Sequence, residues 1–246
     1  MDLLRSKLTE RGVRCDTGEN REELYREIYR ILYREEKMKM EQMEKLFFPF
    51  EQSGFLNAEQ KLALLLYQTE KKNTGGGIGK LLKELVNQEE EIITERRVDA
   101  YYLQQRKEGK CFFSWEEKKN FFTLRLLDRF GAGVVELLNR IGGDELLLGE
   151  FCPNTKEEIL EKTENKIGIR RGSRILRFPF LKITEEELER VIRVIITREK
   201  MGEITMQNPV WRKECPDGRK MKAIRPPGSE NWGLIIQYKE EGGGDK

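Results

Sequence analysis

The segment IGIRRGSRILRF, from Ile167 to Phe178, decides the fold of the second half of the chain. Two short runs of apolar and basic residues flank Gly172-Ser173, a pair that is typical of a two-residue β-hairpin turn. The segment therefore predicts two antiparallel strands joined by a tight turn.

Signals of the same kind lie on both sides of this hairpin. The run Glu145-Leu-Leu-Leu148 precedes it, and Thr184 with Glu187 forms a capping box that opens a helix with one apolar face. Three further short runs follow that helix: VWRKEC at 210–215, KMKAI at 220–224 and GLIIQY at 233–238, the first two separated by Pro216-Asp-Gly218. Together they predict a small antiparallel-sheet α+β domain over about residues 125–240.

The first half of the chain instead shows the spacing of helices. Asn57 with Gln60, and Ser114 with Glu117, are capping boxes in front of apolar stripes. A further helix is expected from about Ile78 into the charged sequence near Arg97. We therefore expect a helical N-terminal region at 1–110 and, because it has almost no apolar residues, a disordered tail at 241–246. The fold class is α+β.

Composition excludes several kinds of site. The 246 residues include 46 Lys and Arg against 44 Asp and Glu, a net charge of +2, and no His. Without His there is no imidazole base, no Ser-His or Cys-His pair and no His-ligated metal. The four Cys residues are far apart, which indicates reduced thiols rather than a zinc ribbon. No apolar run approaches the ~20 residues of a membrane span, and we expect a cytoplasmic protein.

One segment imitates a phosphate-binding loop. Thr74-Gly-Gly-Gly-Ile-Gly-Lys80 has Thr where a P-loop begins with Gly, and Leu81 where the hydroxyl that binds magnesium is needed. A helical stripe also precedes it, where a P-loop follows a strand. Acidic runs such as Glu185-Glu-Glu187 favour a helix N-terminus and mark no catalytic pair. We predict no catalytic residue, no metal site and no cofactor.

Basic residues gather at two places. Arg170, Arg171 and Arg174 surround the predicted hairpin turn, and guanidinium groups match the oxygens of phosphate. The same residues also fit a solvated strand face paired with nearby glutamates. A second cluster runs from 212 to 225. From the residues alone, both interpretations stay open.

The order of the C-terminal motifs resembles a known family. RILRF at 174–178 is followed by a helix, by Asn208-Pro-Val210, by PDGRK at 216–220, by Pro226-Pro227 and by LIIQY at 234–238. This order is similar to that of the N-terminal domain of type II and type IV secretion ATPases, especially the tight-adherence pilus branch. The resemblance covers about residues 125–240 and implies a PAS-like α+β domain.

The resemblance also implies candidate site residues. This chain has DGRKMKAIRPP at 217–227, where the family has a similar segment with Arg at the position of Lys220 and Ser at that of Arg219. Arg225 stands where an apolar residue is usual, and Gln237 where the family has Arg. By this resemblance, Arg219, Lys220 and Arg225 contact nucleotide phosphates across a domain interface. The 246 residues contain no Walker motif of the family's motor domain, and we expect no ATP hydrolysis by this chain alone.

Two function classes follow from these observations. The first is a non-catalytic interaction or assembly module that docks to a secretion or pilus ATPase motor ring or to an inner-membrane platform protein, in the cytoplasm or at the inner face of the cell membrane, with homo-oligomerisation left open. The second is a phosphate- or nucleic-acid-binding regulator that uses the basic hairpins. The near-zero net charge argues against nucleic acid as the partner. An enzyme that uses carboxylates alone is the poorest of the alternatives.

Overall fold

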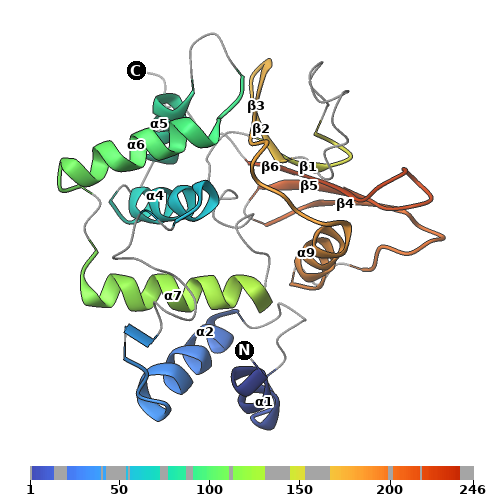
Figure 1. The fold of residues 1–246 in the computed structure, drawn as a ribbon. Helices are drawn as coiled ribbons and strands as arrows, with labels where there is room; N and C mark the ends of the chain where they lie inside the picture. Colours follow the sequence, from blue (N-terminus) through green and yellow to red (C-terminus); the bar gives the residue numbers. More distant parts are fainter. Residues whose placement is uncertain are drawn as a thin grey trace.

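The computed structural model describes residues 2–13, 21–39, 41–42, 54, 56–72, 77–86, 91–110, 113–130, 145–152, 167–198, 202–216 and 218–238. It is an α+β fold, as the sequence predicts. Helices form the first half and a six-stranded antiparallel sheet the second (Figure 1). The predicted tail at 241–246 lies outside the described residues.

The sheet has the order β3-β2-β1-β6-β5-β4, with every neighbouring pair antiparallel. Its strands are, in chain order, β1 (Glu145–Gly149), β2 (Ile167–Arg171), β3 (Arg174–Arg177), β4 (Val210–Glu214), β5 (Lys220–Ile224) and β6 (Gly233–Gln237). The expected hairpin of β2 and β3 is confirmed: Arg171 pairs with Arg174 across Gly172-Ser173, and Gly172 has a φ of +57°. A glycine with positive φ at the first turn position is what a type II′ turn requires.

One face of the sheet, called the inner face here, is apolar over its centre, and strand register adds Arg171, Arg174 and Lys213 to this face near its margins. On β1, Leu146 lies between Ile169 and Ile236, and Leu148 lies between Ile167 and Leu234. The same face continues over β5 and β4 with buried Met221, Ala223 and Trp211. Helix α9 (Glu185–Arg198) runs along this sheet (Figure 1) and buries four residues of its apolar stripe: Leu188, Val191, Ile192 and Ile195. Burial of each such side chain stabilises the fold by roughly 1.5–3 kcal/mol.

The helical half consists of α1 (Asp2–Glu10), α2 (Arg21–Arg30) with the π-helix η1 (Ile31–Glu35), α4 (Ala58–Lys72), α5 (Gly77–Leu85), α6 (Glu95–Lys107) and α7 (Trp115–Phe130). Helix α2 packs against α7, where the hydroxyl of Tyr25 donates to Asn120 Oδ1 at 2.7 Å. Helix α4 packs against α6, where Lys61 Nζ lies 2.8 Å from Asp99 Oδ1. None of the helices within the described ranges is long and apolar enough to cross a membrane.

Two complete capping boxes and one N-cap bond lie where the sequence predicts capping boxes. The Asn57 N–H donates to Gln60 Oε1 and the Gln60 N–H to Asn57 Oδ1, which satisfies two free donors at the start of α4. Ser114 and Glu117 exchange the same pair of bonds in front of α7. At the start of α9 the Glu187 N–H donates to Thr184 Oγ1.

The prediction of a single helix from Ile78 to near Arg97 is wrong. Helix α5 ends at Leu85 and α6 begins at Glu95, and Ile92 between them pairs in parallel with Arg177 of β3. The Ile93 N–H donates to the Arg177 carbonyl, and the Arg177 N–H donates to the Glu91 carbonyl, both at 2.9 Å. Because the β-branched pair Ile92-Ile93 suits a strand and the edge of β3 offers free partners, sheet pairing outweighs helix propensity here.

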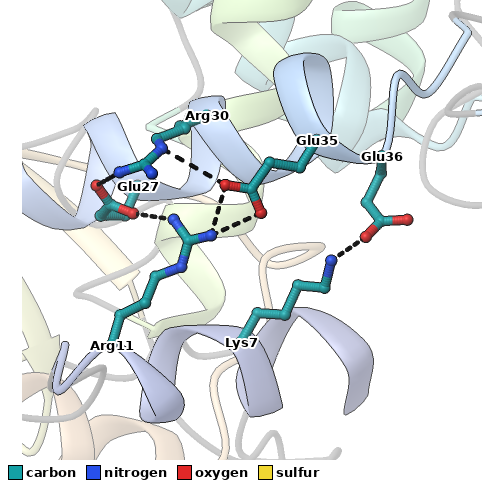
Figure 2. A network of polar contacts seen from close by, with 6 residues as sticks. All are labelled: Lys7, Arg11, Glu27, Arg30, Glu35 and Glu36. Atoms are coloured by element: carbon teal, nitrogen blue, oxygen red, sulfur yellow. Dashed lines mark hydrogen bonds and ion pairs between the residues drawn. The ribbon is translucent and has the colours of Figure 1, made fainter.

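A network of ion pairs holds α1 against α2 and η1 (Figure 2). Arg11 reaches Glu27 at 2.6 Å and Glu35 at 2.5 Å, and Lys7 pairs with Glu36. Leu4 and Leu8 add the apolar part of this contact. The hydrogen bond from Arg11 lowers the pKa of Glu35 below its ordinary value, so the folded state favours the ionised carboxylate.

We expect acid to loosen this end of the molecule. A lowered pKa contributes stability that is present above the ordinary value of 4.5 and is lost as the pH falls through the folded value. Amide hydrogen exchange in α1 should therefore rise as the pH falls below about 4.5 (after correction for intrinsic rates), and Arg11→Gln should flatten this dependence. Glu84→Gln, at an exposed position of α5, is the control and should leave the dependence unchanged. A parental pH profile retained in Arg11→Gln would contradict the assignment.

A second prediction concerns the glycine that ends β1. Gly149 has a φ of +57°, and a Cβ there would collide with the Trp232 carbonyl oxygen and with Leu188 Cδ2. Gly172 has the same φ, but nothing lies within 4 Å of its Cβ position. Gly172→Ala should lower the free energy of unfolding by about 1–2 kcal/mol through backbone strain alone. Gly149→Ala adds overpacking and should lower it by roughly 3 kcal/mol or more. Urea unfolding followed by circular dichroism measures both, and equal losses would contradict the packing described.

Candidate functional site

The second face of the sheet, called the outer face here, carries charge instead of a core. Strand register places Lys220 between Gln237 and Glu214, and Lys222 between Ile235 and Arg212. These side chains point to one side because alternate residues of a strand share a face. The outer face therefore carries three cations on β4 and β5, beside an uncharged strip formed by β6.

An open hollow of about 550 Å³ lies over this region. We call it the basic hollow. Its lining residues are Glu145, Arg212, Lys213, Glu214, Lys220, Met221, Lys222, Ile235 and Gln237. Two carboxylates stand at its sides, Glu145 on β1 and Glu214 on β4, and the first of these is neutralised by Arg170 at 2.6 Å.

Two like charges face each other inside the hollow. Arg212 of β4 stands directly opposite Lys222 of β5. The Cys215 N–H donates to the Arg219 carbonyl and the Arg225 N–H to the Pro209 carbonyl, so Arg212 and Lys222 form a non-hydrogen-bonded pair. In such pairs the strands approach most closely, and like charges there are destabilising. Within the described ranges no carboxylate forms an ion pair with Arg212, Lys220 or Lys222.

A chain segment borders the hollow and positions one of its cations. After β1, Phe151 lies over the outer face, with its ring centroid 4.7 Å from Lys222 Nζ. The cation–π contact holds Lys222, and Ile235 contributes an apolar side chain to the lining of the hollow beside its charges. Such a surface suits a ligand that presents both a negative group and some apolar or backbone surface.

The residues predicted from the resemblance do not gather at one place. Lys220 lies in the hollow, whereas Arg219 is half-buried in the turn before β5. Arg225 lies at the opposite end of β5, where its Cζ is 5.0 Å from the ring centroid of Trp232 and its Nε donates to the Pro226 carbonyl. The fold thus separates Arg225 from Lys220 by the length of a strand.

The three arginines of the hairpin also point in different directions. Arg170 lies on the outer face and pairs with Glu145. Arg171 turns toward the helical half, where its Nη1 donates to the Gly79 carbonyl at 3.2 Å. Arg174, opposite Arg171, is exposed. Arg170 therefore fits the interpretation in which the basic residues lie on a strand face and pair with nearby glutamates.

The sequence analysis includes Arg212 and Lys222 in the basic cluster at 212–225 but does not select them as site residues, although a signal that pairs them exists. The turn Pro216-Asp-Gly218 centres the hairpin of β4 and β5, and counting outward from it pairs 212 with 222. The alternation Lys220-Met-Lys222 then puts both lysines on one face. The exact register of the turn, which decides this pairing, comes from the structure.

Other chemical candidates carry no site. Residues 74–76 lie outside the described part, and from Gly77 on the glycine-rich segment is the first turn of α5, preceded by α4 and not by a strand. Cys152 and Cys215 are buried, and Cys15 and Cys111 lie outside the described residues. Among the residues that the structure describes, no cluster of three His, Cys, Asp or Glu side chains is placed to hold a metal ion.

The chain matches none of the protein-family models and none of the curated proteins with which its sequence was compared.

The like-charge pair predicts an unusual stability change. Arg212→Glu replaces a cross-strand repulsion by an attraction to Lys222 and should raise the free energy of unfolding by about 0.5–1 kcal/mol. Arg212→Gln only removes the repulsion, so its free energy of unfolding should lie between those of the wild type and Arg212→Glu. Urea unfolding at low salt measures this order, and high salt should compress it. A less stable Arg212→Glu protein would show that the two cations do not repel each other in the folded state.

Proposed function

We propose that this chain is a non-catalytic docking module related to the N-terminal domain of secretion and pilus-assembly ATPases. The observation that supports it is the location of the motifs that carry the resemblance. The run at 174–178 contains β3, the segment at 208–227 contains β4 and β5, and the run at 234–238 contains most of β6, and all four strands belong to one sheet. Motifs far apart in the sequence thus contribute to one structural unit of α+β type, and a PAS-like domain is the finer fold that we propose for it.

The exposed parts of this unit indicate where a partner docks. Helix α9 lies along the sheet and the inner face is buried, while residues 91–93 pair with the edge of β3. Among the described residues, the outer face of β4, β5 and β6 carries an open charged surface, the basic hollow. A motor ring, or an inner-membrane platform protein at the cytoplasmic side of the membrane, is the partner that the family resemblance favours.

A second candidate function rests on the hollow itself. Arg212 and Lys222 face each other at a cost in stability, and a bound anion would remove this repulsion. This favours the phosphate-binding regulator over a solvated strand face. Nucleic acid is the weaker form of this alternative, because the net charge of the chain is only +2.

Co-purification with a secretion or pilus motor of the same cell tests the docking function. The wild-type chain should form a complex at micromolar concentration. Arg212→Glu with Lys222→Glu should weaken it on the order of tenfold, since reversing charges at a complementary interface costs affinity. The matched control is Lys83→Glu with Arg96→Glu, two exposed cations of α5 and α6, and it should bind as the wild type does.

The outcomes separate the two functions. No complex with the wild-type chain would overturn the docking module. Binding of inorganic tripolyphosphate that is salt-dependent and lost in the hollow variant, without any motor complex, would support the phosphate-binding regulator in its place.

A further inference from the structure

The two edges of the sheet are in different states. At the β3 edge, residues 91–93 of the same chain supply backbone partners to Arg177. At the other edge stands β4, and no strand from the described ranges pairs with its outer side. An open edge presents unpaired N–H and C=O groups, and such groups are a template for another strand.

The phase of the β4–β5 ladder fixes which residues of β4 are available. The pairs Pro209–Arg225 and Cys215–Arg219 are hydrogen-bonded, so the bonded positions of β4 toward β5 have odd numbers. The N–H and C=O groups of Val210, Arg212 and Glu214 therefore point outward from the sheet. The side chains of the same three residues lie on the outer face, beside the basic hollow.

We propose that the outer edge of β4 receives an extended acidic segment of a partner protein as a seventh strand. This inference rests on the proposed docking function and names the contact through which docking occurs. In an added antiparallel strand, the residue opposite Arg212 has its side chain on the outer face, next to Arg212 and one strand away from Lys222. A carboxylate at that position relieves the repulsion between the two cations.

The remaining positions define the partner sequence further. The residue opposite Glu214 should be neutral or basic, and the residue opposite Val210 apolar. Backbone hydrogen bonds supply affinity and the alternate side chains supply selectivity, as in other cases of strand addition. The partner is thus an acidic strand with one apolar position, and not a polyanion of uniform charge.

A second copy of this chain fits the edge poorly. A two-fold axis at Arg212 would place Arg212 opposite Arg212. An axis at Lys213 would pair Arg212 with Glu214 twice, but it would also oppose two copies of Lys213 and bring Pro216, which has no N–H, opposite Val210, so that a backbone bond of each copy is lost. A different, acidic partner places a carboxylate beside Arg212 and one strand away from Lys222 without the loss of that bond.

A synthetic peptide tests the strand addition directly. The probe is acetyl-TTEETVT-amide, whose second Glu stands opposite Arg212 in the antiparallel register with Val opposite Val210. Amide chemical shifts of the full chain, measured by NMR during titration, should change along β4 and give a saturable affinity. N-methylation of the peptide amides that face β4, at the second Glu and alternate residues from it, should abolish binding. N-methylation of the intervening amides, which point away from β4, should leave binding in place.

Charge variants provide the second half of the test. Arg212→Glu should weaken the affinity for the acidic peptide on the order of tenfold. A peptide with Lys in place of the second Glu should bind this variant with the affinity recovered. The control Lys83→Glu with Arg96→Glu should bind as the wild type does. Because Arg212→Glu is expected to stabilise the fold, loss of binding in this variant does not arise from unfolding.

Each other outcome overturns the proposal. If no peptide binds, or if both methylated peptides bind equally well, no strand is added. If tripolyphosphate binds and displaces the peptide without dependence on its amides, the hollow is a plain anion site. If the chain alone dimerises through β4, the edge is an interface between copies. A motor complex without peptide binding would overturn only the strand addition, and peptide binding without a motor complex would overturn only the relation to a motor.

Discussion

The pairing of residues 91–93 with β3 is the interaction on which the arrangement of the two halves depends. Arg177 is bonded through its N–H and its C=O to Glu91 and Ile93, and its guanidinium lies 3.7 Å from the Glu91 carboxylate. These bonds attach the helical half to the β3 edge, and the bond from Arg171 to Gly79 adds a second attachment nearby. Backbone pairing of this kind satisfies the polar groups of an edge strand, which would otherwise stay open to other chains.

This attachment leaves the sheet asymmetric. At one edge the chain itself bridges Arg177, one face is mainly buried, and the opposite edge and face carry the cations of the basic hollow. Arg212 and Lys222 stand opposite each other across β4 and β5, and like charges in such a cross-strand pair are expected to lower stability. Surfaces that sacrifice stability in this way are typical of binding sites, because the ligand supplies the missing opposite charge.

Local sequence signals predicted the elements of this fold well. The capping residues Asn57, Ser114 and Thr184 each accept the bond that the sequence implied, because a capping box needs only residues within one turn. The hairpin at Gly172 formed for the same reason. The β-bridge at Ile92 was missed because its partner, Arg177, lies more than 80 residues away in the sequence, and a window around Ile92 contains no trace of that partner.

The sequence by itself determined the fold class, the element types at the strong periodic segments, and the presence of two groups of basic residues. Only the tertiary structure decided how these residues combine. In the fold, Arg170 pairs with Glu145, Arg171 donates to the Gly79 carbonyl, and Arg225 lies over the ring of Trp232. Arg212 stands opposite Lys222 across two strands. The physical reason is the strand period of two: a residue's face and its neighbours depend on sheet register, and register is set by pairing across the whole sheet rather than by adjacent residues.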